Sequence, residues 1–471
     1  MGCALVWFRN DLRLDDNPAL RAALDAGLVP IPVYIHAPDE HGEWAPGAAS
    51  DAWRHRALAA LDADLRARGS ALHVLAGPSL AMLQVVAAAT GAEAVFWNRR
   101  YEPAIEERDA AIKRALRQSG LRAESHNGAL LFEPWQIETK QGDPYKVFTA
   151  FWKSAQAQWR LAPTWDAPAQ LPTCPDAPHG RGLDSLRLQP ARGWDAGFWP
   201  HWQPGEAGAR ARLAGFIADA ASDYHAGRDF PARAGTSRLS PHLHFGEIAP
   251  WRIVHAMQQA DLPEAERSAY VRELGWREFA HHVLHHFPHS AGSNFNPRFD
   301  DFPWAKAEPR VLDAWQRGQT GVPIVDAGMR ELWATGWMHN RVRMIVGSFL
   351  TKHLRQHWRH GADWFWDTLL DADLANNSMG WQWVAGTGVD AAPYFRVFNP
   401  LLQAQRFDAK GEYIARWIPE LAPLPTALRL APWTDPAAVR RATRDYPTAP
   451  VIGLAEGRDA ALAAFSSLRA G

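Results

Sequence analysis

TGWMHNRVRM at residues 335–344 and DADLANNSMGWQW at residues 371–383 are the two segments that decide how this chain is interpreted. Both place acids, amides, arginines and indoles in a region whose apolar spacing otherwise predicts buried helix. Buried polar groups are costly unless they have partners, so they usually mark a site. Indoles beside such a site suggest electron movement or base stacking. The two segments therefore predict a helical domain that holds a functional site.

The bulk composition is that of a globular protein with more than one domain. The chain has 471 residues, of which 47% are hydrophobic and 21% charged, and this length exceeds one ordinary core. The formal net charge of -1 does not indicate nucleic-acid binding, although it allows a local basic patch. Cys3 and Cys174 have no zinc-type spacing, which favours a cytoplasmic protein. We identify neither a signal peptide nor a membrane-spanning apolar run.

Residues up to about 131 alternate between strand and helix patterns. Apolar runs predict buried strands at Leu5–Phe8, Ile31–Ile35, Leu72–Leu75 and Ala94–Trp97. Amphipathic stretches predict helices at Pro18–Ala26, Ser50–Arg68, Leu80–Thr90 and Pro103–Ser119. This alternation predicts an α/β domain with a doubly wound, Rossmann-like parallel sheet. The dinucleotide fingerprint G-x-G-x-x-G does not follow the first strand.

The rest of the chain divides into a connection and a larger all-α domain. Residues 163–204 are rich in Pro and Gly, which excludes regular helix and is typical of an interdomain connection. Beyond residue 207 the apolar spacing is helical. We predict helices at Ala211–His225, Ser268–Phe287, Pro309–Gln316, Pro323–Gly336, Asn340–His360 and Asp459–Leu468.

A group of hydroxyl residues precedes one further helix start. Residues 235–241, GTSRLSP, contain Ser240 and Pro241, which suit an N-cap and the first helical position. Hydroxyls and free backbone N–H groups at a helix start can bind an anion. A simple capping turn is the alternative. Arg228, upstream, would add charge for a pyrophosphate or a DNA phosphate.

Two helical stripes place polar residues beside indoles. Glu273, Trp276 and Arg277 share one helix face, either as a pocket wall or as a Glu–Arg surface pair beside a core Trp. A second stripe, with i, i+3, i+4 and i+7 spacing, consists of Trp337, Asn340, Arg341 and Met344. The asparagine and arginine in this stripe favour a lined cavity, whereas the apolar spacing favours plain hydrophobic core, and both interpretations stay open. Arg343 could pair with Asp371 and hold a ring-binding site.

The second quoted segment fits a helix that begins near Asp373. On that helix Asn377 and Trp381 share one face, and Trp383 points elsewhere. N-capping by Asp373 beside core aromatic residues is the alternative interpretation. The four groups of residues together favour a site.

These motifs stand in the order of a known family. The chain resembles the DNA photolyase/cryptochrome family, most closely the class I cyclobutane pyrimidine dimer photolyases of bacteria. The match begins with VWFRNDLRLDDNP at 6–18 and ends near DAAPYFRVFNP at 390–400. The resemblance implies an antenna-binding α/β domain over 1–131, a linker over 132–206, and a helical FAD- and DNA-binding catalytic domain over 207–471.

The resemblance implies a U-shaped FAD in the helical domain and no metal. By position, the cofactor-binding residues are Tyr224, Thr236, Ser237, Arg238, Leu239, Ser240, Arg277, Asn340, Asp371, Asp373 and Asn377. Asn377 stands where the family places a residue against flavin N5, and an amide there can support the reduced anionic flavin. Plant cryptochromes carry Asp at this position.

The resemblance also implies an electron-hopping chain and a pocket for the damaged bases. The chain from flavin to surface is Trp381, Trp358 and Trp304. Glu273 would hydrogen-bond the dimer and stabilise its radical anion, while Trp276 and Trp383 would stack on the bases. The implied substrate and DNA contacts are Arg228, Glu273, Trp276, Arg277, Asn340, Arg341, Met344, Trp383 and Gln403.

The implied function is light-driven repair of pyrimidine dimers in UV-damaged DNA by a monomeric deoxyribodipyrimidine photo-lyase. Reduced FAD absorbs near-UV or blue light and passes one electron to the dimer, the ring opens, and the electron returns. Photolyases are among the known base-flipping enzymes, and extrusion costs least for a poorly paired base. Phosphate contacts should make binding salt-dependent.

The antenna chromophore is the point where the motifs depart from the family. Some members that bind methenyltetrahydrofolate carry Asn-Glu after a Tyr-Glu pair, whereas this chain has Tyr101-Glu102-Pro103-Ala104-Ile105. Glu106 could substitute for the missing acid. We expect 5,10-methenyltetrahydrofolate, with 8-hydroxy-5-deazaflavin or no antenna as alternatives.

Three other functions are compatible with parts of the sequence. A (6-4) photolyase usually has His where this chain has Asn340. A cryptochrome photoreceptor without repair activity often carries a C-terminal extension or loses the pocket acid, whereas this chain stops soon after Leu468 and keeps Glu273. A nucleotide-binding α/β enzyme is disfavoured by the missing glycine fingerprint and the helical domain.

Overall fold

In the computed structural model, which describes residues 2–174 and 180–470, five parallel strands form one sheet in the order β3-β2-β1-β4-β5. The strands are β1 (Cys3–Phe8), β2 (Val29–His36), β3 (His73–Ala76), β4 (Ala92–Asn98) and β5 (Arg122–His126). The four predicted strands are confirmed. The sequence did not predict β5, because this edge strand, RAESH, is short and polar, as edge strands often are.

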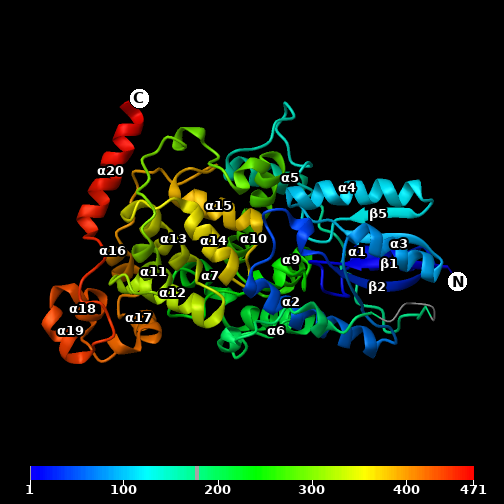
Figure 1. Ribbon diagram of the computed structural model, residues 1–471, viewed down its shortest axis with the longest axis horizontal. Coiled ribbons are helices and arrows are strands. Elements are labelled where there is room, and N and C mark those ends of the chain that lie inside the picture. Colours follow the sequence, from blue (N-terminus) through cyan, green and yellow to red (C-terminus); the bar gives the residue numbers. More distant parts are fainter. Residues whose placement is uncertain (1, 175–179, 471) are drawn as a thin grey trace.

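Helices cover both faces of the sheet (Figure 1). Alternate residues of β1 point to opposite faces, so Val6 packs with α1 (Pro18–Asp25) and α2 (Ala48–Ala67), and Leu5 packs with α3 (Ser79–Thr90) and α4 (Pro103–Gln118). The predicted doubly wound α/β domain is therefore confirmed.

The segment between the domains is packed rather than loose. It contains α5 (Phe148–Gln158), and later in the chain Phe198 and Trp202 join the core on the α1–α2 face of the sheet. Trp337 and Leu370 of the helical domain join that same core. One continuous apolar region therefore connects the two domains.

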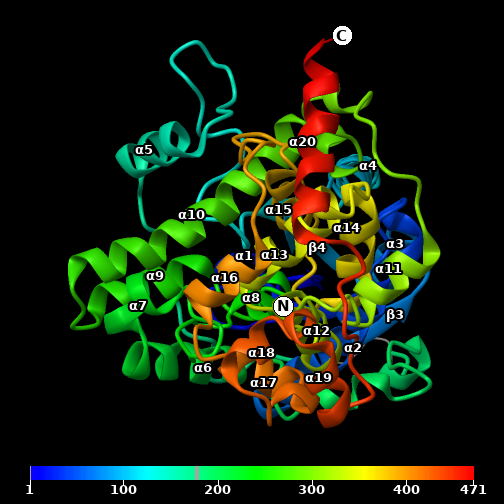
Figure 2. The same ribbon diagram turned by 90° about the vertical axis from the view of Figure 1, so that its left-hand side faces the viewer.

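The C-terminal domain is helical throughout its described part, as predicted (Figure 2). Its α-helices are α6 (Glu206–Asp219), α7 (Tyr224–Gly227), α8 (Ser240–His244), α9 (Pro250–Gln259), α10 (Glu264–His286), α11 (Pro309–Gln316), α12 (Pro323–Thr335), α13 (Asn340–Ser348), α14 (Trp358–Thr368), α15 (Leu374–Ala385), α16 (Pro400–Phe407), α17 (Glu412–Trp417), α18 (Thr426–Leu430), α19 (Pro436–Ala442) and α20 (Leu454–Ala470). Helices α17 to α19 gather at the end far from the N-terminal domain (Figure 1). Among the described helices, none is both long and apolar enough to cross a membrane.

Two predicted long helices are wrong because each is interrupted. The helix predicted at Ala211–His225 ends at Asp219, and a short 3-10 turn precedes α7. The helix predicted at Asn340–His360 becomes a π-helix over Phe349–His353 and then stops. His357 starts a new helix by accepting a hydrogen bond from the backbone N–H of Arg359. Apolar spacing continues across such breaks, so periodicity alone does not reveal them.

Candidate active site

A cavity of about 550 Å³ lies among α7, α8, α10, α13 and α15. All the predicted cofactor-binding residues line it: Tyr224, Thr236, Ser237, Arg238, Leu239, Ser240, Arg277, Asn340, Asp371, Asp373 and Asn377. The same cavity is lined by the predicted lesion-pocket and electron-transfer residues Arg228, Glu273, Trp276, Arg341, Met344, Trp381 and Trp383. Trp358, Trp304 and Gln403 do not line it. Four separate sequence motifs thus meet around one space.

Asp371 organises one wall of this cavity. Arg343 Nη2 donates to its Oδ2 over 2.8 Å, which confirms the predicted pair. Ser240 Oγ also donates to Oδ2, over 2.5 Å, and accepts from Trp337 Nε1 over 3.2 Å. Helix α8 does begin at Ser240, but the prediction that this hydroxyl caps the helix is wrong, because it faces Asp371 instead.

On α10, Glu273 forms an ion pair with Arg228 of the neighbouring loop. The alternative of an i, i+4 surface pair with Arg277 is wrong. Arg277 instead donates to the backbone carbonyl of Ala129 over 2.8 Å, outside the helical domain. The carboxylate and the guanidinium therefore have separate partners, and both still line the cavity.

Trp276 is supported from behind by a residue that the sequence analysis missed. The Phe148 ring, at the start of α5, stacks on it with centroids 3.7 Å apart and planes 11° apart. The backbone N–H of Phe148 is in turn bonded to Asp390, 3.0 Å away. The only sequence signal was an aromatic cluster in a segment interpreted as linker, so α5 is part of the site's support.

Helix α15 supplies three more side chains. Asp373 caps it by accepting from the backbone N–H of Asn376 over 2.9 Å, as the capping interpretation predicted. Burial alone would raise the pKa of Asp373, but His281, His244 and Arg277 together lower it. Asn377 is anchored to α14 because its Nδ2 donates to the carbonyl of Ala362 over 3.0 Å.

Trp383 lines the site, as the resemblance implied, although it was predicted to point from another face of the helix than Asn377 and Trp381. It lies two residues after Trp381 on α15, yet both indoles line the same cavity. The cavity wraps around this helix, so side chains on two of its faces reach it.

The three predicted electron-transfer indoles lie on α15 (Trp381), on α14 (Trp358) and in the loop before α11 (Trp304). The Trp381 ring packs on the α14 backbone, since a Cβ added at Gly361 would lie 2.0 Å from its Cη2. Trp358 begins the same helix, fully buried. The His357 ring contacts both Trp358 and Trp304. Its centroid lies 5.6 Å from that of Trp358 and 5.1 Å from that of Trp304.

The sequence and fold match known proteins over the whole chain. Residues 4–174 match the family model "DNA photolyase", and residues 270–467 match "FAD binding domain of DNA photolyase". A deoxyribodipyrimidine photo-lyase of Agrobacterium fabrum is 44% identical, covering 99% of this chain and 98% of the relative. The chain belongs to the DNA photolyase family.

Cryptochromes are also similar to this photolyase-family chain. Cryptochrome-1 of Arabidopsis thaliana is 37% identical over 97% of the chain and 69% of that protein. A solved bacterial class III photolyase from Agrobacterium tumefaciens has a TM-score of 0.96 at 43% identity, covering 100% of this chain and 98% of the other. The predicted class I subtype is therefore not confirmed.

The cavity fits the FAD that a photolyase-family domain binds. Its volume lies within the usual range of ligand sites. Arg238 and the hydroxyls of Thr236, Ser237 and Ser240 suit phosphate and ribose groups, and the apolar and indole walls suit ring systems. Nε1 of Trp381 is buried and has no hydrogen-bond partner among the residues that the structure describes. A ligand that brings an acceptor would satisfy this donor.

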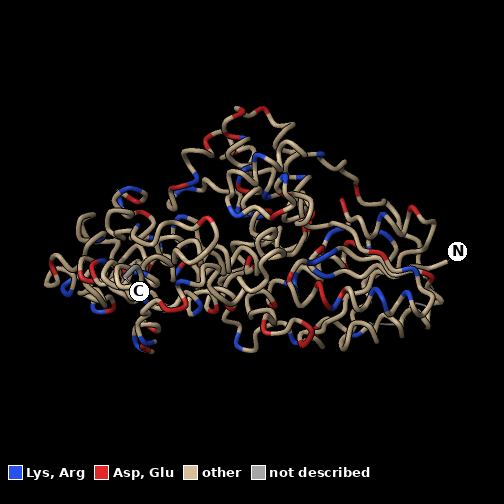
Figure 3. The backbone as a smooth tube through the Cα atoms, turned by 90° about the horizontal axis from the view of Figure 1, so that it is seen from above, with Lys and Arg blue, Asp and Glu red and all other residues tan. Residues whose placement is uncertain are grey.

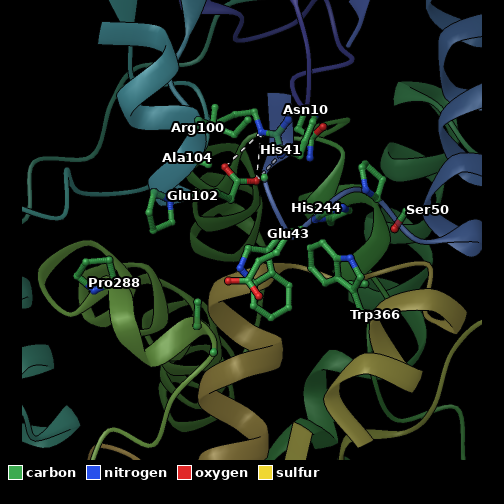
Figure 4. Close-up of a pocket in the computed structure, with 18 of the residues that line it drawn as sticks. Asn10, His41, Glu43, Ser50, Arg100, Glu102, Ala104, His244, Pro288 and Trp366 are labelled. Carbon is green, nitrogen blue, oxygen red and sulfur yellow. Dashed lines mark hydrogen bonds and ion pairs between the residues drawn. The ribbon is translucent and has the colours of Figure 1, made fainter. Parts of the chain in front are cut away.

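A second cavity, of about 430 Å³, lies between the two domains of this photolyase-family chain (Figure 4). Arg100 and Glu102 form an ion pair in its wall, and Trp44 and Trp366 also line it. His244 and Ala372 line both this cavity and the FAD cavity. The two spaces are therefore separated by a single layer of residues.

Glu106, the candidate substitute for the missing folate-motif acid, lies beside a histidine of α10. Its Oε1 lies 3.1 Å from Nδ1 of His285, and it does not line the second cavity. Nearby, the crevice at the carboxyl ends of β1 and β2 holds only about 30 Å³. Arg9 is one of the residues that line it; this arginine bonds Asp109 over 2.6 Å and lies over the Trp7 ring.

Proposed function

We propose that this chain is a deoxyribodipyrimidine photo-lyase that repairs cyclobutane pyrimidine dimers in DNA. The observation that carries the proposal is that the cofactor-binding residues and the lesion-pocket residues line one cavity. Bound reduced FAD would supply one electron on absorbing light. The high similarity to the class III structure supports grouping the chain with that class.

The side chains of the cavity would bind and orient the lesion. Glu273, with about a third of its side chain exposed, would hydrogen-bond the pyrimidine carbonyls, and Arg228 would orient the acid. Trp276 and Trp383 would stack on the flipped bases, each contact contributing about 1–3 kcal/mol. Positive and negative charges are interspersed along the chain, so DNA affinity would come from local arginines such as Arg341 (Figure 3).

Three indoles, on α15, on α14 and in the loop before α11, would carry electrons between the surface and the FAD cavity. Trp381 lines the cavity, Trp358 is buried behind it, and Trp304 is partly buried. Indoles that lead from a cavity wall toward the surface suit stepwise oxidation. We propose that electron transfer through these three indoles re-reduces FAD under illumination.

The second cavity is our candidate for the antenna chromophore, with 5,10-methenyltetrahydrofolate as the favoured ligand. Two indoles suit a pterin ring, and Arg359, which also lines this cavity, suits an anionic tail. The small crevice beside Arg9 argues against a ligand at the carboxyl ends of β1 and β2, where open α/β sheets often bind one. We further propose that the protein acts as a monomer in the cytoplasm.

The test is an absorption spectrum of the purified protein, followed by illumination with oligonucleotides carrying either a thymine dimer or a (6-4) product. We expect a flavin spectrum and restoration of the thymine-dimer strand only. Restoration of the (6-4) strand alone would support the (6-4) alternative. Flavin photoreduction without any repair would favour a cryptochrome photoreceptor, to which the similarity with Cryptochrome-1 points.

A further inference from the structure

Glu331 is a buried carboxylate outside the residues that line the FAD cavity. It lies on α12 and is 2% exposed. Its Oε2 accepts the hydroxyl of Tyr413 over 2.7 Å and the backbone N–H of His339 over 3.2 Å. Its Oε1 lies 3.6 Å from Nη2 of Arg238. An ionised acceptor at this depth needs several partners, and here each oxygen has one or more.

One of these partners lines the cavity, and another directly precedes a residue that lines it. Arg238 lines it from the 235–240 loop, and His339 stands just before Asn340 at the start of α13. Arg238 has a φ of 51°, which side-chain-bearing residues adopt only when their surroundings hold them there. Its guanidinium lies 4.4 Å above the Trp337 ring. Glu331 is thus the carboxylate that holds this arginine from the side of α12.

We propose that Glu331 is a positioning residue that sets how tightly the protein retains FAD, by holding Arg238 toward the cavity, with Tyr413 fixing the carboxylate. This inference rests on the proposed role of Arg238 as an FAD ligand. It also gives α17, which carries Tyr413, a function at a cavity that it does not line. Burial lowers the pKa of Arg238 and the nearby Glu331 carboxylate opposes that shift, which agrees with the geometry.

Glu331→Gln is the main test. The amide oxygen can still accept from Tyr413 and His339, but its NH2 group then faces Arg238 and repels the guanidinium. We expect the dissociation constant of FAD, from flavin fluorescence titration of the apoprotein, to rise about tenfold, because the buried ion pair that orients the Arg238 guanidinium is lost. An unchanged dissociation constant would overturn the proposal.

Asp326→Asn is the matched control. Asp326 is also buried on α12 and accepts from the hydroxyl of Tyr446 over 2.6 Å and from the backbone N–H of Thr320 over 2.8 Å. It does not line the cavity. We expect it to lower the melting temperature of the apoprotein at least as much as Glu331→Gln while leaving FAD affinity within about twofold. Equal loss of FAD affinity in the two variants would mean a general structural effect and would overturn the proposal.

A double-mutant cycle with Arg238→Ala separates this proposal from the one it rests on. We expect Arg238→Ala to weaken FAD binding, and Glu331→Gln to cost nothing further in that background. If Arg238→Ala binds FAD normally, the assignment of Arg238 as a ligand fails, and the positioning role with it. If Arg238→Ala weakens binding and Glu331→Gln adds its full loss, only the positioning role fails.

Tyr413→Phe, which leaves the carboxylate intact, is the second variant and is used if Glu331→Gln does not fold. It should weaken FAD binding by roughly two- to threefold.

Discussion

At the scale of single residues, the environment of Glu273 makes it suited to bind a neutral base. Its ion pair with Arg228 orients the carboxylate without placing it deep in the protein. Water can still reach both groups, so the pair itself adds little to stability. The pair instead fixes the Glu273 carboxylate as a hydrogen-bond acceptor in the same cavity wall as the Trp276 ring.

Glu273→Ala should weaken binding of a dimer-containing oligonucleotide about tenfold or more, because a charge-assisted hydrogen bond is lost. FAD content should stay unchanged. The measurement is lesion affinity by fluorescence anisotropy together with the repair yield. Glu264→Gln, an exposed carboxylate on the same helix that bonds Arg267 and Ser268, is the control and should bind normally. Full repair by Glu273→Ala would remove the acid from the proposed mechanism.

Trp304→Phe should block photoreduction of oxidised flavin, because phenylalanine is much harder to oxidise than tryptophan. Repair with chemically pre-reduced protein should be spared, since that reaction does not use the indole chain. The measurements are the flavin absorbance under illumination and the repair yield. Trp417→Phe, an indole that packs against the helical core from α17, should photoreduce normally. Equal photoreduction by Trp304→Phe and wild type would rule out Trp304 as the last member of the electron-transfer path.

At the scale of elements, the close approach of α14 and α15 depends on glycine. Because Gly361 has no side chain, the Trp381 ring can lie directly on the α14 backbone. The indole is thereby held one turn from Trp358 along that helix. The contact between the two helices thus fixes where the first member of the proposed electron path stands relative to the helix that carries the second.

Gly361→Ala should displace Trp381, because the new methyl carbon would lie 2.0 Å from a ring carbon. We expect a loss of about 1–3 kcal/mol of unfolding free energy and slower photoreduction. Chemical denaturation and flavin absorbance under illumination measure the two effects. Gly215→Ala, on α6 with open space around the added carbon, should instead stabilise by about 0.5–1 kcal/mol. Normal stability and photoreduction in Gly361→Ala would contradict this packing.

Helix α13 depends on a histidine that must stay neutral. His339 caps it through Nδ1, which accepts the backbone N–H of Arg341 over 3.1 Å. Burial, helped by Arg238, Arg341 and Arg343 and opposed by Asp229, lowers the pKa of His339 to about 4. A protonated ring could not accept this bond, so acid should weaken the cap.

The pH dependence follows from this lowered pKa. The unfolded chain binds a proton at His339 near pH 6.5 and the folded chain only near pH 4, so the contribution is fully present above pH 6.5 and is lost as pH falls toward 4. We expect wild type to lose about 1–2 kcal/mol more than His339→Asn, which keeps a capping acceptor, between pH 7.5 and pH 5. Urea unfolding at both pH values measures this. Equal losses of unfolding free energy in the two proteins would contradict the role of neutral His339 as the helix cap.

At the scale of the whole molecule, the arrangement of the domains creates the second cavity. Residues from the α/β domain, such as Arg100, and from α14, such as Trp366, face each other across it. Trp366 also bonds the backbone carbonyl of Ala45 over 2.7 Å and so fastens the two domains together. An antenna bound there would lie one residue layer from FAD.

Trp366→Ala should reduce binding of added 5,10-methenyltetrahydrofolate at least tenfold, since one of the two indoles that suit its ring is removed. The bound chromophore, measured by near-UV absorbance after gel filtration, should fall while flavin content stays constant. Trp333→Ala, which removes a half-exposed indole on α12 outside this cavity, should bind the folate like wild type. If Trp366→Ala binds as much folate as wild type, the antenna must bind at another site.

Several features of fold and site could be predicted because their signals are local. Apolar runs predicted four strands, and the opposite charges of two neighbouring motifs suggested the pairing of Arg343 with Asp371. The breaks around the π-helix and the edge strand β5 were not predictable, because the first keeps its apolar spacing and the second has too few apolar residues. The roles of the site residues remain predictions that the variants above test.

The sequence by itself determined the alternating α/β domain, the helical domain and the motif residues that meet at the cavity, because periodicity and short motifs involve neighbours along the chain. Only the tertiary structure decided that Phe148 supports Trp276, that Glu106 bonds His285, and that Tyr413 and Glu331, 82 positions apart, hold Arg238. Such contacts join residues that carry no shared local pattern. Their partners are set by how whole helices pack.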